Sequence, residues 1–224
     1  MVVIFHGFLG TYFEFIPLIS KFKKVLFFDF YSQRLEDFIP KLVKESSHHT
    51  LIGIGYSMGG RILYHLGLQF PHLFTKIILL SSKTGLDPKE ESYLQQRKSL
   101  ENEWIQQIKT DLTSFLFKWY SNEKLFGPIL QNPRFMPILE EKKKLKISKV
   151  IESIQLYSVT NYPSFPSKLE YFLLCGQLDL AYCVLPKAQL IPRAYHLCYF
   201  DNLDFCIEKI LEIIAFTQLK GHSN

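Results

Sequence analysis

Residues 52–61 read Ile52-Gly53-Ile54-Gly55-Tyr56-Ser57-Met58-Gly59-Gly60-Arg61 and contain the pattern Gly-x-Ser-x-Gly. In this pattern, the nucleophile elbow, a strand turns sharply into a helix and the serine lies at a strained position. The flanking Gly55 and Gly59 are required because a side chain at either would clash. The turn exposes the hydroxyl of Ser57 at a helix N-terminus, where developing negative charge is stabilised. The pattern predicts a catalytic serine; the alternative is a packing serine in an ordinary strand–helix turn.

The residues around the elbow favour the catalytic interpretation. The segment 50–54 is short and rich in β-branched and apolar residues, which is typical of a buried parallel strand. Residues 61–69 have apolar side chains at helical spacing and stop before Pro71. A strand, the elbow and a helix therefore follow one another in the required order.

The composition is that of an ordinary globular protein. The 224 residues suffice for one substantial domain, with 47% apolar and 21% charged residues. The net charge of +5 suits a small anionic substrate. The sequence lacks the basic stripe interleaved with aromatic residues that would indicate binding of nucleic acid. No apolar run approaches the roughly 20 residues of a membrane span. Residues 1–5 lack the basic region of a signal peptide, so we expect a cytoplasmic protein.

The four cysteines have neither C-x-x-C nor zinc-finger spacing. We therefore expect buried, reduced thiols of a cytosolic protein. No metal and no cofactor is predicted. The cysteines are Cys175, Cys183, Cys198 and Cys206.

The apolar pattern along the chain predicts an α/β fold, with a mostly parallel sheet and helices on both faces. Residues 84–168 interrupt this pattern with charged amphipathic helices and no convincing buried strand, which predicts a helical lid over the active site. The expected organisation is a core of residues 1–83 and 169–224 with the lid, residues 84–168, inserted. Expected strands are 2–5, 25–29, 50–54, 76–81, 169–176 and 189–192; expected core helices include 12–22 and 35–45, with Phe38, Leu42 and Val43 on one side of the latter.

Two apolar stripes in the lid are interpreted as packing surfaces rather than as membrane or partner helices. One contains Leu94, Trp104, Ile105, Ile108, Leu112, Phe115 and Trp119, and the other contains Ile147, Val150, Ile151, Ile154 and Tyr157.

The first expected strand runs into His6-Gly7-Phe8. A strand that ends in His-Gly-aromatic is where a serine hydrolase places one oxyanion-hole donor, here the backbone N–H of Phe8. The second donor is the backbone N–H of Met58, after the serine. His6 is interpreted as a loop-shaping residue, and a simple glycine turn is the alternative for the whole segment.

A serine nucleophile requires a base and an orienting carboxylate, in the chain order serine, acid, histidine. Asp179 follows the expected strand 169–176, at the end of a parallel strand where functional groups collect. His196 lies after the next strand and before the last helix. Asp201 and Asp204 are rival acids, but they lie where helix caps are expected, and Asp201 or Asn202 is predicted to cap the closing helix. We expect His48, His49, His72 and His222 to be solvated.

Several motifs resemble one family, the 2-succinyl-6-hydroxy-2,4-cyclohexadiene-1-carboxylate synthases, which act in menaquinone biosynthesis and have the α/β-hydrolase fold. The resemblance extends from His6 onward and includes the lid. Its motifs are the run 55–61, Gly85-Leu86, Arg97, Trp119-Tyr120 with Phe126, Leu174-Cys175-Gly176-x-x-Asp179 and Ile191-Pro192-Arg193-Ala194-x-His196.

The resemblance implies a lyase rather than a hydrolase. Such enzymes eliminate pyruvate from 2-succinyl-5-enolpyruvyl-6-hydroxy-3-cyclohexene-1-carboxylate, with the serine oxygen of the triad as the base. The substrate carries several carboxylates, which guanidinium groups bind well. Arg61 and Arg97 match two of the family's arginines, and Lys142 stands where a third is expected. The resemblance also places Tyr56, Trp119 and Tyr120 at the substrate.

Purely structural roles are the alternative for the proposed binding residues. Arg61 would simply cap or pair on its own helix, Arg97 would be a solvated partner of Glu101 four residues on, and Trp119 would be core. Lys142 is interpreted as a surface residue rather than a ligand.

Three features depart from the family pattern. The two strands that normally open this fold are not expected ahead of the strand 2–5, residues 30–34 lack a proline-glycine-rich loop, and Tyr195 replaces a small residue before the histidine. Two other functions therefore stay open. A serine esterase, thioesterase or carbon–carbon-bond hydrolase predicts an apolar pocket, and a non-catalytic scaffold predicts a broken path from Ser57 through His196 to Asp179. The sequence does not distinguish a monomer from a homo-oligomer.

Overall fold

The sheet of this protein is parallel and has six strands in the order β2-β1-β3-β4-β5-β6. A computed structural model describes residues 1–87, 89, 91–164 and 167–215. The strands alternate with helices along the chain, so each parallel pair is joined by a crossover. The strand bounds are β1 Val2–Phe5, β2 Val25–Phe28, β3 Leu51–Tyr56, β4 Phe74–Leu80, β5 Phe172–Gly176 and β6 Ala188–Ile191.

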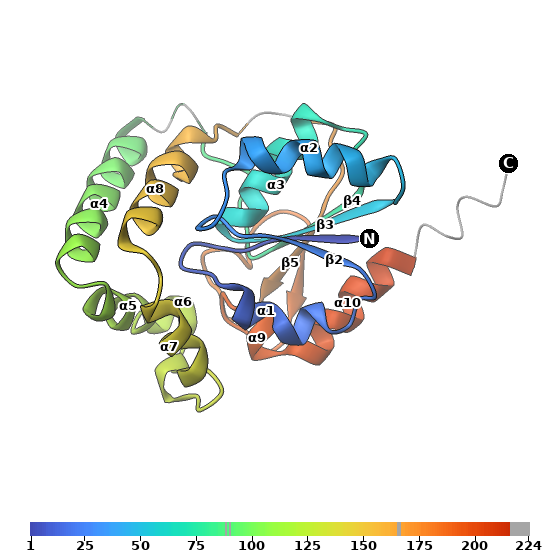
Figure 1. Ribbon diagram of the computed structural model, residues 1–224. Coiled ribbons are helices and arrows are strands. Elements are labelled where there is room, and N and C mark those ends of the chain that lie inside the picture. Colours follow the sequence, from blue (N-terminus) through green and yellow to red (C-terminus); the bar gives the residue numbers. More distant parts are fainter. Residues whose placement is uncertain (88, 90, 165–166, 216–224) are drawn as a thin grey trace, which may run out of the picture.

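Helices cover both faces of the sheet (Figure 1). α2 (Leu35–Ser46) and α3 (Met58–Gln69) lie on one face, and α1 (Tyr12–Ile19), α9 (Cys198–Asp201) and α10 (Leu203–Ala215) lie on the other. Successive side chains of a strand point to opposite faces. Accordingly, Val2 and Ile4 belong to the apolar cluster beneath α1 and α10, whereas Val3 and Phe5 belong to the cluster beneath α2 and α3.

The strand and core-helix positions predicted from periodicity are confirmed to within a few residues. One side-chain placement is wrong. Phe38 and Leu42 on α2 are buried, but Val43 is 46% exposed, because the next position along a helix is turned about 100° away from Leu42. The α/β-hydrolase-type arrangement of a parallel sheet between two helical layers is otherwise as expected.

Residues between β4 and β5 form helices that lie together at one side of the sheet (Figure 1). Side chains from these helices and from the carboxyl ends of the strands line one cavity, described below. The helices are α4 Glu91–Thr110, α5 Leu112–Tyr120, α6 Glu123–Phe126, α7 Met136–Lys143 and α8 Ile147–Tyr157, with 3-10 turns at Ile129–Gln131 and Val159–Asn161.

The apolar stripe predicted from Leu94 to Trp119 belongs to two helices rather than one. The carboxylate of Asp111 accepts hydrogen bonds from the backbone N–H groups of Thr113 and Ser114, at 2.8 and 3.1 Å. These bonds make Asp111 the N-cap of α5, so α4 ends and the chain turns. The second stripe lies on α8 as predicted, although Ile147 is 40% exposed.

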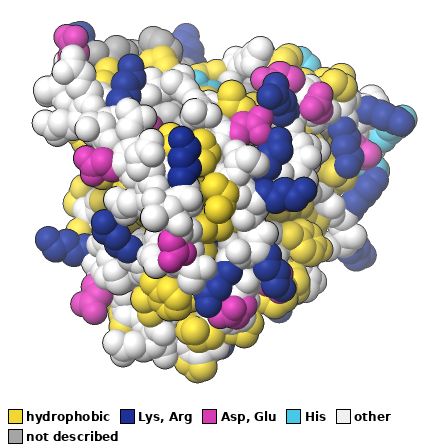
Figure 2. All heavy atoms as spheres, turned by 60° about the vertical axis from the view of Figure 1, so that its left-hand side comes forward, with side chains coloured by type: hydrophobic (Ala, Val, Ile, Leu, Met, Phe, Trp, Pro, Cys, Tyr) yellow, Lys and Arg dark blue, Asp and Glu magenta, His cyan; other side chains and the backbone are white. Residues whose placement is uncertain are grey.

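Charged side chains of both signs are interspersed with apolar ones on the face that the helical segment presents (Figure 2). Several are paired along single helices, such as Lys143 with Glu140 and Lys149 with Glu152. Such exposed pairs contribute little to stability. No helix in the described ranges has the length and apolar content needed to cross a membrane.

Candidate active site

Ser57 connects β3 to α3 with φ 50° and ψ −112°, a strained conformation for a residue with a side chain. The two flanking glycines are necessary. A Cβ atom at Gly55 would lie 2.5 Å from the Cα atom of Gly60, and one at Gly59 would lie 2.3 Å from the carbonyl oxygen of His6. The local geometry is therefore that of a nucleophile elbow.

A continuous hydrogen-bonded path runs from Ser57 to Asp179. The Nε2 atom of His196 lies 2.9 Å from Ser57 Oγ, and its Nδ1 atom lies 2.7 Å from Asp179 Oδ2. The carboxylate of Asp179 is fully buried and His196 is 4% exposed. Because an ionised carboxylate only accepts, Nδ1 carries the proton and Nε2 is free to accept the hydroxyl proton of Ser57. This path is the one that a non-catalytic scaffold was expected to lack.

Aromatic rings hold the imidazole in this position. The ring centroids of Tyr182 and Tyr56 lie 4.7 and 5.3 Å from that of His196. Burial raises the pKa of the Tyr182 hydroxyl to about 12 and that of Tyr56 well above its ordinary value. Both phenols are therefore neutral near pH 7, and their rings pack against the imidazole.

The rival acids lie elsewhere, and the predicted helix cap is wrong. Asp201 Oδ2 accepts the backbone N–H of Tyr195 at 2.8 Å, and Asn202 Nδ2 donates to the carbonyl of Pro192 at 2.9 Å, so neither side chain caps α10. Asp204 is exposed. Burial raises the pKa of Asp201 to about 6, although the Tyr195 N–H and the charge of Arg134 oppose that shift.

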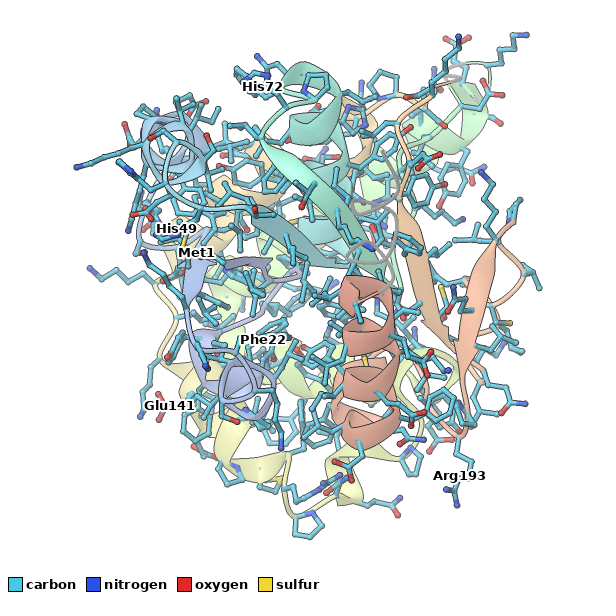
Figure 3. The ribbon with its side chains drawn as sticks, turned by 90° about the vertical axis from the view of Figure 1, so that its right-hand side faces the viewer. Met1, Phe22, His49, His72, Glu141 and Arg193 are labelled. Atoms are coloured by element: carbon cyan, nitrogen blue, oxygen red, sulfur yellow. The ribbon has the colours of Figure 1, made fainter. Side chains whose placement is uncertain are left out.

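The other histidines predicted to be solvated are not at this site. His48 and His72 are exposed, His49 is half-buried beside Lys24, and His222 lies outside the described residues. His49 and His72 lie on the outside of the fold, far from each other (Figure 3). Arg193, from the motif that contains His196, is exposed and points away from the body of the protein (Figure 3).

The loop after β1 supplies a backbone N–H beside Ser57. The Gly10 N–H donates to the carbonyl of Gly7 at 3.0 Å, which closes a turn with Phe8 at its first central position. The backbone N–H of Phe8 donates no hydrogen bond within the described part of the chain. The Met58 N–H opens α3 and so has no acceptor inside the helix. Both residues line the cavity that contains Ser57, so both N–H groups are candidates for an oxyanion hole.

His6 shapes this loop rather than entering the cavity. Its ring is fully buried, Nδ1 lies 2.7 Å from the carbonyl of Gly7, and Nε2 accepts the Phe30 N–H at 3.1 Å. These contacts bring the end of β1 and the end of β2 together.

The two predicted arginines converge on one cavity with Ser57 and His196. Arg61 is 8% exposed, and one of its Nη atoms donates to the carbonyl of Tyr157 at 3.2 Å. Burial lowers the pKa of Arg61 to about 10, which leaves the guanidinium charged at neutral pH. Its Nε has no partner among the described atoms. Donors of Arg61 are therefore available to an anion in the cavity.

The surroundings of Arg97 agree with both of its interpretations, as a substrate-binding residue and as the ion-pair partner of Glu101. Its Nε atom lies 2.7 Å from Glu101 Oε1, as expected for an i,i+4 pair, and its guanidinium lies 4.6 Å from the centre of the Trp104 ring. Arg97, Glu101 and Trp104 all line the cavity. The ion pair thus orients the guanidinium while leaving it at the cavity wall.

Trp119 lines the cavity, whereas Tyr56 and Tyr120 do not. The Trp119 ring packs edge-on against Phe8, with centroids 5.3 Å apart. Tyr56 is 4% exposed and packs behind His196 against Tyr199. Tyr56 therefore supports the imidazole and is separated from the cavity space.

Lys142 contradicts the surface interpretation and is also absent from the cavity wall. Its side chain is fully buried, forms an ion pair with Glu14 and donates to the carbonyl of Leu9 at 2.7 Å. Burial lowers the pKa of the Lys142 ammonium, and the charge of Glu14 opposes that shift. Sequence reasoning missed this because the partner lies 128 positions away on α1.

Sequence reasoning also missed several cavity residues. Lys83 follows the carboxyl end of β4, where parallel sheets collect functional groups, and its Nζ lies 5.7 Å from the centre of the Tyr182 ring. That position was the available signal. The other missed cavity residues include Tyr93, Glu101, Ser158 and Tyr182.

Three of the four thiols, Cys175, Cys198 and Cys206, are buried as expected, while Cys183 is half-buried; all four are free in the described part of the chain. Residues 1–87, 89, 91–164 and 167–215 contain no group of three or more His, Cys, Asp or Glu side chains that could hold a metal ion.

The fold and the site together define a class of protein. MenH from S. aureus superposes with a TM-score of 0.81 at 16% identity, over 97% of this chain and 94% of that one. A hydrolase from Pseudomonas aeruginosa PA01 superposes with a TM-score of 0.66 at 15% identity, over 95% and 89%. A thermophilic esterase from Thermogutta terrifontis also gives 0.66 at 15%, over 96% and 89%. The chain has the α/β-hydrolase fold.

Curated relatives give a narrower resemblance. A putative 2-succinyl-6-hydroxy-2,4-cyclohexadiene-1-carboxylate synthase from Haemophilus influenzae is 28% identical over 171 residues, which is 70% of this chain and 68% of that protein. The synthase of that name from Escherichia coli O1:K1 is 23% identical over 176 residues, which is 73% and 68%. No protein-family model matches the sequence. The resemblance to these synthases that the motifs indicate is confirmed, and the chain is an enzyme of the α/β-hydrolase fold.

Proposed function

We propose that this enzyme eliminates pyruvate from 2-succinyl-5-enolpyruvyl-6-hydroxy-3-cyclohexene-1-carboxylate and forms 2-succinyl-6-hydroxy-2,4-cyclohexadiene-1-carboxylate. The observation that carries the proposal is the shared cavity of a Ser-His-Asp path and two guanidinium groups, Arg61 and Arg97. A substrate with several carboxylates requires such groups, since a guanidinium binds a carboxylate through two parallel hydrogen bonds. The curated relatives named as this synthase support the same reaction.

In the proposed reaction Ser57 is the base. Its hydroxyl proton lies on the path to His196 Nε2, so the serine oxygen gains basic character and removes a proton from the ring carbon. Asp179 orients the imidazole and stabilises the imidazolium that forms. The proton from the ring carbon is thus held between Ser57 and His196.

The negative charge then moves onto a carbonyl oxygen conjugated with the ring carbon. The backbone N–H groups of Phe8 and Met58 are the proposed donors to that oxygen, and preorganised donors of this kind contribute strongly to catalysis. When the charge returns, a ring double bond forms and the bond from the ring to the enolpyruvyl oxygen breaks. The departing enolate takes the proton held at His196 and leaves as pyruvate.

We propose that residues 84–168 act as the lid of this site over the core 1–83 and 169–224. Arg97, Trp104 and Trp119 from the helical segment line the cavity opposite Ser57. A lid excludes water and completes the binding surface when it closes. We infer that Lys83, a cation at the cavity wall, supplies the third positive charge that Lys142 does not provide. The free thiols are consistent with a reducing compartment, so we place the reaction in the cytoplasm.

The test is pyruvate release by the purified protein, measured with lactate dehydrogenase and NADH. We expect a rate far above the spontaneous one, and a Ser57→Ala variant that is no faster than the spontaneous reaction. The second candidate is a serine esterase, because the same path and N–H groups also suit acyl transfer. Rapid turnover of an aryl ester without pyruvate release beyond the spontaneous rate would assign that function instead.

A further inference from the structure

The loop that carries the Phe8 N–H contains a residue in an unfavourable conformation. Leu9 has φ 58°, in the left-handed region where glycine is usually found, and its side chain is fully buried. Leu9 occupies the second central position of the turn closed by Gly7 and Gly10. A leucine does not adopt this backbone by preference, so neighbouring groups must hold it there.

Both backbone groups of Leu9 are bound by side chains from elsewhere in the chain. Its N–H donates to the hydroxyl oxygen of Tyr31 at 2.8 Å, and its carbonyl accepts from the ammonium of Lys142 at 2.7 Å. These two bonds fix the peptide planes on either side of Leu9. One of these planes is shared with Phe8, whose own N–H is the proposed oxyanion donor.

Lys142 is itself held by Glu14. The ion pair joins α7 of the helical segment to α1 of the core, and both side chains are almost completely buried. The Lys142 ammonium also lies 5.6 Å from the centre of the Tyr120 ring. A buried ion pair often contributes no net stability, because burial removes the hydration of both charges. The bond from Lys142 to Leu9 gives this pair a directional role in the loop.

We propose that Lys142, Glu14 and Tyr31 form a clamp on Leu9 that positions the Phe8 N–H toward the cavity. Lys142 and Tyr31 are positioning residues in this scheme, because they act on the reacting atoms through the backbone and touch no substrate. Since Lys142 belongs to α7, the clamp also ties the oxyanion loop to the helical segment. The inference rests on the proposed function in one respect, the use of the Phe8 N–H as an oxyanion donor.

The experiment compares Lys142→Met and Tyr31→Phe with the matched control Lys144→Met. Methionine keeps the apolar length of the lysine stem and removes the ammonium. Lys144 ends the same helix, pairs with Glu141 on the surface and is 67% exposed at its side chain. Three quantities are measured: kcat and KM for pyruvate release, the inhibition constant of phenylboronic acid, and the thermal unfolding midpoint. Boron bonded to Ser57 Oγ places an oxygen where the oxyanion is expected, so this inhibitor reports on the donors.

We expect Lys142→Met and Tyr31→Phe each to lower kcat by roughly 10- to 100-fold with KM changed less than about threefold, because displaced donors affect the transition state most. Phenylboronic acid should bind each variant more weakly by a comparable factor, and Lys144→Met should match the wild type. Adding Glu14→Gln to Lys142→Met should restore the unfolding midpoint, because no unpaired carboxylate stays buried, without restoring kcat.

A purely structural ion pair predicts a different result. Wild-type kcat and wild-type inhibition by phenylboronic acid in folded Tyr31→Phe would overturn the clamp, whatever Lys142→Met does. If Lys142→Met does not fold, Tyr31→Phe alone decides. If the wild type releases no pyruvate, the proposed function fails, but inhibition by phenylboronic acid and hydrolysis of p-nitrophenyl acetate still test the clamp.

Discussion

The backbone N–H of His196 donates a 3.0 Å hydrogen bond to the backbone carbonyl of Leu125, which lies on α6 of the helical segment. The neighbouring residues also meet. The ring of Tyr195 lies where a side chain at Gly127 would be, since a Cβ atom there would lie 2.3 Å from the ring. Tyr195, the residue that departs from the family pattern, is therefore accommodated by a glycine across the contact. The loop that carries the imidazole is held by α6 and the turn after it.

Gly127→Ala should disturb this contact in two ways. The substitution puts a Cβ atom against the Tyr195 ring, and it places alanine at φ 57° and ψ −154°, a region almost exclusive to glycine where another residue costs about 1–3 kcal/mol. We expect kcat for pyruvate release to fall about tenfold or more, because small displacements of catalytic groups are costly. Steady-state kinetics and thermal unfolding of the variant measure both effects.

Gly127→Ala combined with Tyr195→Ala is the control. The second substitution removes the ring, so part of the lost kcat should return. Wild-type kcat in the single variant would show that the position of the His196 loop does not depend on this contact.

The triad residues should act as one unit. Ser57→Ala and His196→Ala should each lower kcat by roughly 10³-fold or more, and the double variant should be little slower than either single variant. The reason is that Ser57 needs the imidazole for its basicity, so removal of either residue removes the base. Single and double variants are compared by pyruvate release at saturating substrate. Additive losses would mean that the two residues act in separate steps.

Arg61→Lys tests fork-shaped recognition of a carboxylate. Burial lowers the pKa of Arg61 only to about 10, so the guanidinium is charged near pH 7. A lysine at this position preserves the charge but loses the two parallel hydrogen-bond donors. We expect KM to rise by about tenfold, which corresponds to one weakened charge-assisted hydrogen bond. Arg34→Lys is the matched control, because Arg34 is exposed and pairs with Glu152 at the surface. Equal KM values in both variants would remove Arg61 from the substrate site.

Asp201 should make stability depend on pH. Its pKa is raised from 3.8 to about 6 in the folded protein, mainly by burial. The folded state therefore binds more protons than the unfolded state between these values, and stability should fall as the pH rises from about 4 to 6. Asp201→Asn keeps an oxygen for the Tyr195 N–H and removes the charge. We expect this variant to lose the Asp201 contribution to that decline and to unfold about 2–4 °C higher at pH 7.

Thermal unfolding between pH 4 and pH 7 measures this effect in both proteins. Parallel curves for the two proteins would show that Asp201 ionises alike in the folded and unfolded states.

The core of the fold could be predicted from local patterns because the spacing of apolar residues differs between strands and helices and is visible within each segment. The run 50–61 predicts the elbow, since Gly55 and Gly59 have a steric reason that is visible in the sequence. Asp179 and His196 could be placed because the ends of parallel strands meet at one edge. These predictions rest on neighbours within a few residues or on the topology of the sheet.

Other features depend on partners that are distant in the sequence, so they could not be predicted from local patterns. Lys142 lies in a lysine-rich run that looks solvated, and only the approach of Glu14 and Leu9 accounts for its burial. Asp111 could have been recognised as an N-cap, but the apolar stripe continues in phase across it. Tyr56 is next to the serine in sequence, yet the alternation of a strand turns its ring behind the imidazole.

The contact between Gly59 and the end of β1 bears on which residues of this fold can be substituted without moving the oxyanion donors. Because nothing but main chain separates the start of α3 from the carbonyl of His6, the spacing between that helix and the end of β1 does not depend on the side chains that line the cavity. Arg61, Arg97 and Lys83 can be exchanged without altering that spacing. Substitutions in the cavity wall could thus admit new substrates, while the Phe8 and Met58 amides keep the positions that the backbone contact and the clamp on Leu9 give them.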